Sequence, residues 1–562
     1  MFDFPDPKTT DPQKHRVQRI LEIIPGFLTW ATLIGMFVLS IIRPVWMAVF
    51  IIMFDIYWIF RTIFITYYSV IAYKRLAEGK RTDWWERCQN IVNPQEYLKN
   101  ISEKIKLFKE SLHEVSFFSF SEKWKIKKEI KRLKKYRKEV ERIKNADNEI
   151  MDWRKIIHVV LLPTANEGAE IIEPAIQSVA DGNFPNQQII ILLATEEREN
   201  EEDRLKKVNY LKKKFDGVFR DFLVTTHEVA AGELKCKASN ATYAAKKLKI
   251  YLDERGIDYT RVVFSNFDCD SVSHPEYFAA LTYAYITSPD RLQMAYQPLP
   301  MYNNNLWDTN ACVRVIVISS SFWHMFQSTR TQMVTFASHS EAFDTLVKVD
   351  FWPVNIINED SIIYWKCFSY FHGKYTVKPI YLPVSLDAVL AETYWKTIKN
   401  QYKQKRRWAY GIEHFPTLMR AIWPDKKIKF LRKIYAGFEM LEGNWSWATS
   451  AFILAILGWL PVIFGGSEFN QSVLAHNLPF VTRYLMIFAT SGLVISMFLS
   501  FFLLPPRPAK YSKKRYIYMF LQWFLAPFIA TVLGSFPAVD SQTRIMIKKY
   551  FGEFWVTEKI KK

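Results

Sequence analysis

Three short stretches hold the residue types that could do chemistry in this chain. FDCDS contains Asp268 and Asp270, NEDS contains Glu359 and Asp360, and QKRRWAYG begins at Gln404. Two converging carboxylates suit Mg²⁺ or Mn²⁺ when phosphate oxygens complete the coordination. Two neighbouring carboxyl groups raise each other's proton affinity, which helps a general base to work near neutral pH. Three adjacent cations in the third stretch repel one another, so they indicate a negatively charged partner nearby.

Each stretch has a plain alternative when it is taken alone. The D-x-D pair also occurs as solvated loop aspartates. Glu359 and Asp360 could cap the helix that SIIYWKCF predicts, and Trp408 could belong to an interfacial belt of aromatic residues. The elements that position the three stretches therefore decide between chemistry and these structural roles.

Composition favours a membrane protein. At 562 residues the chain is too long for one ordinary soluble core, so several units are expected. The net charge of +19 suits either a nucleic-acid binder or a membrane protein. The hydrophobic content of 49% and the aromatic content of 16%, in long uncharged runs, favour the membrane and no nucleic-acid partner. The five cysteines form no C-x-x-C pair, so neither a zinc site nor a disulfide framework is indicated.

Five apolar runs are long enough to interact with a bilayer core, which needs about 20 residues for a helix to cross it. After a cytosolic segment 1–19, two runs joined by Arg43-Pro44 predict a transmembrane helical hairpin over 20–73. Inside it, Asp55 is either a functional acid or a partner of Arg61. The other three runs, 445–464, 478–504 and 516–536, lie in a predicted membrane region 431–536. Cations on both sides of the last run predict a re-entrant or interfacial path and a cytosolic carboxyl terminus.

The segment between the membrane runs divides into a basic insert and an α/β domain. Residues 74–150 include a cationic helix from Glu122, which either binds anionic lipid headgroups or packs as a solvated helix on the next domain. Residues 151–396 alternate strand and helix patterns, which predicts a mostly parallel sheet. Ligands bind such a sheet beyond the carboxyl ends of its strands, where FDCDS ends the third predicted strand. Residues 397–430 predict interfacial amphipathic helices that contain QKRRW.

In this order, D-x-D, E-D and Q-x-x-R-W resemble the membrane-embedded processive glycosyltransferases of family 2, which include cellulose, chitin, hyaluronan and mannan synthases. The resemblance covers residues 156–411 by motif and the flanking helices by architecture, with Asn358 where the family usually has Thr or Ser. It implies a GT-A, Rossmann-like α/β domain flanked by transmembrane helices. It also implies inverting transfer of a sugar from a nucleotide-sugar, preferably a UDP-sugar, to a growing β-linked polysaccharide. The location implied is the cytosolic face of a bacterial inner membrane, with contact to membrane lipids.

The same resemblance assigns roles to the motif residues. Asp360 becomes the catalytic base with Glu359 beside it, and Asp268 and Asp270 hold Mg²⁺ or Mn²⁺, with Asp268 also near the nucleotide. Arg407 binds the diphosphate bidentately, and Gln404 hydrogen-bonds nearby. Trp408 lines the acceptor end at the mouth of a membrane channel.

Shorter pieces extend the resemblance over the nucleotide. PTANEG maps Thr164 and Glu167 to the nucleobase and ribose, and ATEER places Glu196 near uracil, where the family usually has aspartate. KASN maps Lys237 to the diphosphate. The alternatives are a helix amino terminus at Asn166-Glu167 and solvated charges at Glu196 and Lys237.

Two further stretches bear on the acceptor and on gating. FWVTEK in the tail 537–562 resembles a gating-loop motif, in which Thr557 and Lys559 would close over the nucleotide, and the alternative is a frayed cationic tail. TFASHSEAF departs from the family's Gly-containing acceptor motif, so His339 either contacts the acceptor, tunes the base or simply packs. Lys405 and Arg406 remain as lipid-facing or interdomain charges.

Three functions compete at this point. The first is a polysaccharide synthase, which Q-x-x-R-W favours. The second is transfer of one sugar to a lipid-linked acceptor, which the narrow set of five apolar runs keeps open. The third is a catalytically idle membrane scaffold, against which the joint presence of the motif residues argues.

Overall fold

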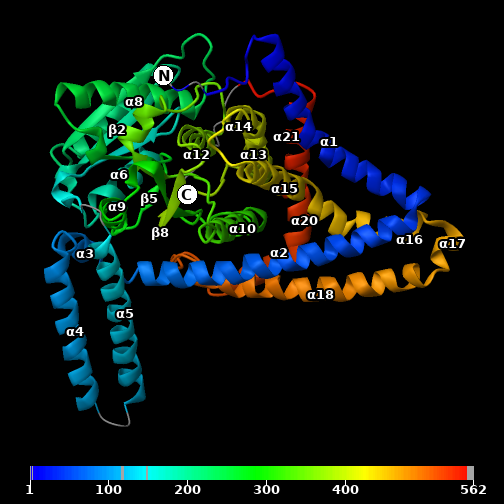
Figure 1. Ribbon diagram of the computed structural model, residues 1–562, viewed down its shortest axis with the longest axis horizontal. Helices are drawn as coiled ribbons and strands as arrows, with labels where there is room; N and C mark the ends of the chain where they lie inside the picture. Colours follow the sequence, from blue (N-terminus) through cyan, green and yellow to red (C-terminus); the bar gives the residue numbers. More distant parts are fainter. Residues whose placement is uncertain (1, 3, 116–118, 147–149, 553–562) are drawn as a thin grey trace.

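The computed structural model describes residue 2 and residues 4–115, 119–146 and 150–552. An α/β domain stands beside a set of long helices, and a separate helical hairpin projects from it (Figure 1). Three helical segments of the described part are long and apolar enough to cross a membrane, or four if a bent pair counts as one span.

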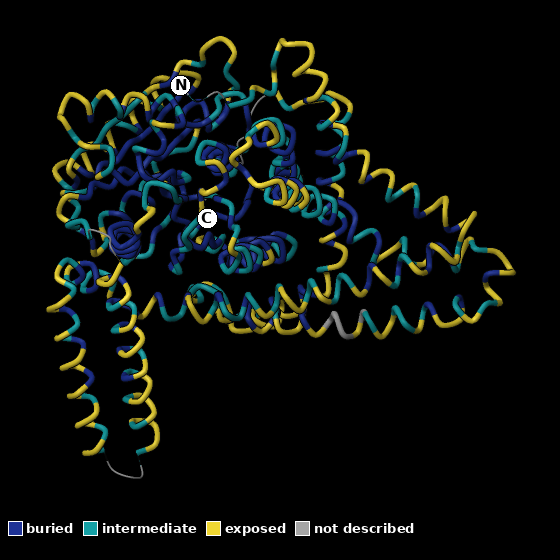
Figure 2. Tube along the Cα trace, viewed as in Figure 1, coloured by how far each residue is buried: buried dark blue, intermediate teal, exposed yellow. Residues whose placement is uncertain are grey.

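The first two long helices lie where the sequence predicts a helical hairpin. α1 (Pro12–Ile42) and α2 (Pro44–Gly79) are separated only by Arg43, whose backbone leaves the helical region before Pro44 starts the next helix. α18 (Val473–Phe502) packs along α2 (Figure 1). The outer faces of α1 and α2 stay exposed (Figure 2), and they carry large apolar side chains such as Phe27, Trp46 and Phe60. Such faces suit lipid contact.

A sharp bend lies in the first of the carboxyl-terminal runs, whereas the sequence predicts a re-entrant or interfacial path for the last run. α15 (Phe430–Ala455) meets the following Leu457–Phe464 segment at 53°, which is a broken span or a re-entrant loop. The last run instead belongs to one helical segment, Arg515–Met546, of 32 residues. Within this segment, Ala530–Ser535 form a π-helical stretch that contains Gly534. The sharp break is therefore in the earlier run, not in the last one.

The α/β domain is built on an eight-stranded mixed sheet in the order β3-β2-β1-β4-β7-β6-β8-β5. β1 pairs in parallel with β2 and β4, and β2–β3 and β6–β8 are also parallel, whereas β7 is antiparallel to both its neighbours and β5 is antiparallel to β8. The mostly parallel prediction is confirmed, with the antiparallel strands added. The strands are β1 (Ile157–Pro163), β2 (Ile189–Glu196), β3 (Asp221–His227), β4 (Val262–Asn266), β5 (Val272–Ser273), β6 (Met294–Met301), β7 (His339–Ala342) and β8 (Thr376–Ser385).

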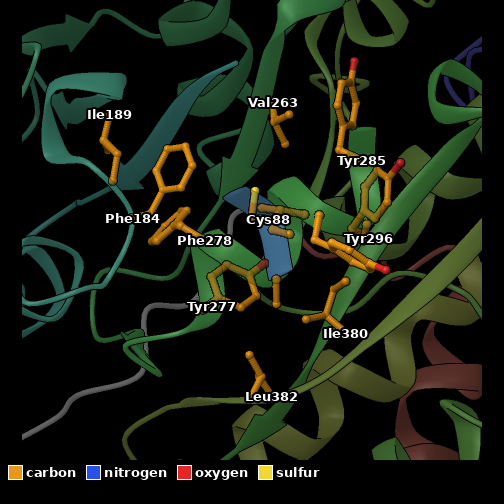
Figure 3. Packing of buried hydrophobic residues seen from close by; sticks show 14 of the residues in the cluster. Cys88, Phe184, Ile189, Val263, Tyr277, Phe278, Tyr285, Tyr296, Ile380 and Leu382 are labelled. Carbon is orange, nitrogen blue, oxygen red and sulfur yellow. The ribbon is translucent and has the colours of Figure 1, made fainter. Parts of the chain in front are cut away.

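Two apolar layers bury the two faces of the sheet. Along β1, Val160 and Leu162 point into one layer and Val159 and Leu161 into the other, which is the period of two of a strand. α6 (Ala169–Ala180) and α9 (Tyr277–Ile286) contribute to the first layer, part of which Figure 3 shows. α8 (Lys237–Glu254) and α12 (Glu359–Tyr370) contribute to the second. Continuous apolar strands are typical of a parallel sheet that helices cover on both faces.

The basic insert forms the projecting hairpin (Figure 1). α5 (Phe120–Asn145) packs against α4 (Pro94–Glu114) through an apolar stripe that includes Leu133 and Val140, and this stripe joins the first layer of the sheet. Of the two sequence interpretations, this matches a solvated helix packed on its neighbours.

The remaining helices connect these parts. α10 packs against α2 and β6, and α13 packs against α21. They are α3 (Trp84–Asn90), α7 (Glu201–Lys214), α10 (Ala311–Gln327), α11 (Phe343–Lys348), α13 (Tyr394–Ala409), α14 (His414–Ile422), α16 (Leu460–Phe464), α17 (Gly466–Asn470), α19 (Arg515–Leu521), α20 (Ala526–Ile529) and α21 (Phe536–Met546).

Candidate active site

One cavity of about 680 Å³ brings most of the predicted site residues together. Its wall has two parts of different character. The charged half is formed by strand ends of the sheet and by the starts of α8 and α12, and the aromatic half is formed by α2, α10, α13 and α15. The predicted residues that line the cavity are Thr164, Glu167, Glu196, Lys237, Asp268, Asp270, Glu359, Asp360, Gln404, Arg407 and Trp408.

Parallel strands explain why residues so far apart in the chain converge. β2, β1 and β4 lie side by side in the same direction, so their carboxyl ends meet at one edge of the sheet. Asp268 and Asp270 do not lie on the strand itself, because β4 ends at Asn266 and the two aspartates occupy the turn that follows. The turn, and not the alternation of a strand, therefore brings both carboxylates to the cavity.

Lys237 joins the D-x-D and E-D motifs. It is the first residue of α8, and its Nζ lies 2.7 Å from Asp268 Oδ1, 2.8 Å from Glu359 Oε1 and 3.5 Å from Asp360 Oδ1. Burial opposes its charge, but the three carboxylates outweigh burial and raise the pKa of Lys237 well above its usual value. Lys237 is thus a permanent cation between the two acidic motifs.

Asp360 has the protonation properties of a general base. Burial first, and the neighbouring Glu359 second, raise the pKa of Asp360 to about 7, while Lys237 acts in the opposite direction. Both carboxylates stand in the first turn of α12, so the helix-start alternative and the catalytic role hold at the same residues. A carboxyl group with a pKa of about 7 is ionised in about half of the molecules near neutral pH, and its carboxylate form is basic enough to accept a proton.

His339 lies behind Asp360 and is fully buried. Its Nδ1 is 3.0 Å from the carbonyl oxygen of Phe336 and 3.8 Å from Asp360 Oδ1, and its Nε2 is 3.6 Å from Glu341 Oε1. Burial disfavours the imidazolium, but Glu341 and Asp360 outweigh burial and raise the pKa of His339. This position favours tuning of the base over direct contact with the acceptor.

The Q-x-x-R-W motif lies on α13 and faces the same cavity. Gln404 is buried, and its Oε1 accepts a hydrogen bond from Gln401 Nε2 at 3.1 Å. Arg407 lines the wall, and burial lowers its pKa while Glu359, Asp268 and Asp360 act to raise it. The ring of Trp408 is 5.6 Å from that of Tyr302. Trp408 lies in the aromatic half, together with Trp58, Trp323 and Trp447.

Asn358 and Glu413 tie the E-D and Q-x-x-R-W motifs to each other. Asn358 Nδ2 donates to the carbonyl oxygen of Arg407 at 3.1 Å. Glu413 Oε1 accepts the backbone N–H groups of Ile357 at 3.1 Å and Asn358 at 3.3 Å, and burial raises the pKa of Glu413 to about 8. Asn358 therefore ties the start of α12 to the backbone of α13. Sequence reasoning missed Glu413, which carries no motif signal beyond its place three residues after Tyr410.

A buried network supports the predicted nucleotide residues. Glu199 Oε1 accepts from the backbone N–H of Glu196 at 3.0 Å and from Thr164 Oγ1 at 3.3 Å. Lys207 pairs with Glu199, and its Nζ donates to Thr164 Oγ1 at 3.2 Å and to the carbonyl oxygen of Glu167 at 3.0 Å. The sequence did not indicate Glu199 or Lys207, because an acid and a base eight residues apart on a loop and a helix form no recognisable pattern.

The carboxylates of Glu167 and Glu196 are held by local contacts. Glu167 Oε2 accepts the backbone N–H groups of Ala165 at 2.8 Å and Asn166 at 3.1 Å, so these residues form the turn before α6 and not its first turn. Glu196 pairs with Arg198, which also lines the cavity. Burial raises the pKa of Glu196, and Arg198 opposes this effect. Glu196 is therefore a buried, paired acid and not a solvated charge.

The structure decides between the alternatives for Lys405 and Arg406, excludes one for Asp55, and leaves the gating residues untested. Lys405 does not face lipid, because its side chain lines the cavity between Ser320 of α10 and Trp447 of α15, which makes it an interdomain charge. Arg406 is an interdomain charge, with Nη1 3.1 Å from Asp540 Oδ2 on α21. Arg61 does not pair with Asp55, because it binds Glu442 on α15, and Asp55 lines a separate small cavity with Thr482. Thr557 and Lys559 lie outside the described residues.

The D-x-D motif has the donor chemistry for a divalent metal shared with a substrate. Within residues 2, 4–115, 119–146 and 150–552, no group of three or more His, Cys, Asp or Glu forms a metal cage. Mg²⁺ bound to a nucleotide needs only one or two protein carboxylates, because phosphate and water complete its shell. Asp268 and Asp270 line the cavity, and Asp270 Oδ2 is oriented by the N–H of Asp387 at 2.7 Å. The residues present therefore fit Mg²⁺ or Mn²⁺ held with a diphosphate.

Comparisons with known proteins add weak likenesses. No family model matches the chain, and no curated protein matches it. Among solved structures, the mannosyltransferase PcManGT from Pyrobaculum calidifontis, in complex with GDP-Man and Mn²⁺, is 14% identical. The match covers 63% of this chain and 92% of that chain, with a TM-score of 0.36. S. aureus TarS 1–349 in complex with UDP-GlcNAc is 11% identical over 61% of this chain and 90% of that chain, with a TM-score of 0.33. The functional argument therefore rests on the cavity.

Proposed function

We propose that the protein is an inverting glycosyltransferase that moves a sugar from a nucleotide-sugar to the end of a β-linked glycan at the cytosolic face of a membrane. One observation carries the proposal: D-x-D, E-D and Q-x-x-R-W residues, distant in the chain, line one cavity beside helices long and apolar enough to cross a membrane. A structural helix cap or a solvated loop would not require this convergence. An idle scaffold would not require a half-buried base whose pKa is raised to about 7.

The reaction is a single displacement in which Asp360 acts as the base. Asp360 takes the proton of an acceptor hydroxyl, and the acceptor oxygen attacks the anomeric carbon of the donor sugar. The bond between that carbon and the diphosphate oxygen breaks as the new glycosidic bond forms, so the configuration inverts. His339 and Lys237, on two sides of Asp360, hold the carboxylate in place and stabilise its charge.

The charged half stabilises the leaving nucleoside diphosphate. Arg407 and Lys237 neutralise the charge that builds on it, and the guanidinium matches phosphate geometry bidentately. A bound Mg²⁺ or Mn²⁺ at Asp268 and Asp270 supplies further neutralisation of the diphosphate. Thr164, Glu167 and Glu196, held by Lys207 and Glu199, orient the nucleoside.

A second candidate is transfer of one sugar to a lipid-linked acceptor. The observation that favours it is the cavity wall formed by Trp58, Arg61 and Ile65 of α2, a helix long and apolar enough to span a bilayer. An acceptor held in the membrane by a lipid would reach the base from this side. The small number of long apolar helices also suits this alternative.

The test uses the purified full-length protein in lipid with a panel of radiolabelled UDP-sugars and GDP-sugars. A size ladder of labelled products supports chain extension, and one labelled lipid supports single transfer. No turnover with any donor, together with normal cellular behaviour of Asp360→Asn, would overturn the glycosyltransferase proposal and favour a scaffold.

A further inference from the structure

Lys405 is the unexpected cation of the aromatic half. It follows Gln404 on α13, and its Nζ donates to Ser320 Oγ of α10 at 3.0 Å. The same atom lies 4.5 Å from the ring centroid of Trp408 and 5.8 Å from that of Trp447 on α15. Lys405, Ser320, Trp408 and Trp447 all line the cavity. The ammonium is therefore held against two indole rings at the place where an acceptor would meet Trp408.

No carboxylate balances this ammonium within the described part of the chain. Its contacts are one hydroxyl and two aromatic faces. Other charges of the aromatic half are paired, Arg61 with Glu442 and Glu439 with Arg330. His324, a further titratable side chain of this wall, is kept neutral because burial lowers its pKa to about 3. One hydroxyl and two ring faces offset only part of the free energy that it costs to remove an ammonium from water. Such an arrangement is typical of a site that binds an anion.

The donor does not explain this position. The diphosphate has its own cations, Lys237 and Arg407, grouped around Asp268, Glu359 and Asp360. Lys405 instead lies over the indole ring of Trp408, in the aromatic half of the cavity. A sugar bound against Trp408 would bring a substituent carboxylate or phosphate to the ammonium.

We propose that Lys405 binds an anionic group of the acceptor. The group is a carboxylate of a uronic acid unit or a phosphate that links the glycan to a lipid. The inference rests on the proposed function only in calling the bound molecule an acceptor. Binding of an anion by Lys405 can be measured whether or not the protein transfers a sugar. Burial lowers the pKa of free Lys405 to about 7, so an anion that restores its charge would raise that pKa.

The test is calorimetric binding to the full-length protein in nanodiscs of neutral lipid, without donor. The probes are two matched pairs: a tetrasaccharide of glucuronic acid with its carboxyl-reduced form, and a polyprenyl phosphate with the corresponding polyprenol. In at least one pair the anionic member should bind wild type about 10-fold more tightly than the neutral member, because a charged hydrogen bond is then formed. Lys405→Met should remove this difference, and Lys405→Arg should keep most of it. Lys399→Met, at an exposed position of the same helix, should behave as wild type.

The outcomes distinguish a glycan carboxylate from a lipid phosphate, and they test anion binding by Lys405 separately from sugar transfer. A preference for the uronate pair assigns a glycan carboxylate, and a preference for the phosphate pair assigns a lipid-linked acceptor. Equal binding of both members of both pairs to wild type would overturn the inference. An equal loss of neutral and anionic binding in Lys405→Met would also overturn it, because Lys405 would then only support Trp408. Intact, Lys405-dependent anion binding without sugar transfer would instead contradict the proposed function.

Discussion

The charged half and the aromatic half of the cavity differ in how they are built. The charged half is a network in which acids and bases touch: Lys237 contacts three carboxylates, and Lys207 connects Glu199 to the strand ends. The aromatic half has four indole rings with few charges between them. Fixed charges suit a diphosphate that must be held in one place. Flat ring faces suit a sugar ring, which can stack against them.

The two halves also come from different parts of the chain. The charged half depends on strand ends of one sheet, and its elements share two buried apolar layers. The aromatic half combines α10 and α13 with helices long and apolar enough to cross a membrane. Substitutions in the charged half should therefore affect the chemical step, and substitutions in the aromatic half should affect acceptor binding.

Asp360→Asn should have the largest effect. Loss of the base should lower kcat by about 10²–10⁴-fold, because an amide cannot take the acceptor proton. Nucleotide binding should persist, since Arg407 and Lys237 remain. The measurement is initial rate and nucleoside diphosphate affinity of the purified variant in lipid. A variant with more than a tenth of the wild-type rate would remove Asp360 from the base role.

Lys207→Met should destabilise the charged half. Lys207 and Glu199 have side chains only 6% and 5% exposed, so the substitution leaves Glu199 buried without its cation. The expected cost is about 3–5 kcal/mol in the free energy of unfolding, with a raised donor KM. The change in the free energy of unfolding is measured in detergent with tryptophan fluorescence as the signal.

Lys206→Met provides the matched control on the same helix. Lys206 pairs with Glu202 at an exposed position, so its loss should cost less than about 1 kcal/mol. Equal stability of the two variants would show that the buried network does not support the nucleotide wall.

Glu359→Gln should have the smallest effect, a shift in pH dependence. The base works when deprotonated, so the wild-type kcat/KM should fall as the pH falls below about 7, where Asp360 becomes protonated. Removal of the Glu359 charge lowers the pKa of Asp360, and the acidic limb should move down by about one pH unit. The measurement is kcat/KM from pH 5 to 9, with Glu392→Gln at an exposed position as control. An unmoved limb would assign it to another group.

The sequence predicted the residues that line the charged half better than the residues that hold them in place. Strand–helix alternation predicted the α/β domain, and the ordered motifs together with PTANEG, ATEER and KASN predicted eleven residues of the cavity wall. β3, β5, β7 and β8 were missed, because β5 and β7 are short, DFLVTTH of β3 carries polar residues, and TVKPIYLPVS of β8 carries two prolines that weaken the strand pattern. Glu413, Lys207 and Lys405 could not be assigned, because each gains its meaning from a neighbour distant in the chain. A single sequence shows local motifs, whereas the packing of the folded chain determines which charged side chains line the cavity or are buried beside it.

Trp408→Ala gives the most direct test of the central claim that one cavity couples a donor half to an acceptor half. Donor hydrolysis and transfer to acceptor are measured together on one labelled nucleotide-sugar, for wild type and variant in lipid. Hydrolysis should stay within about twofold, while transfer falls by about 10-fold, the cost of a lost aromatic contact. A variant that loses hydrolysis and transfer in parallel, or keeps both, would contradict the account.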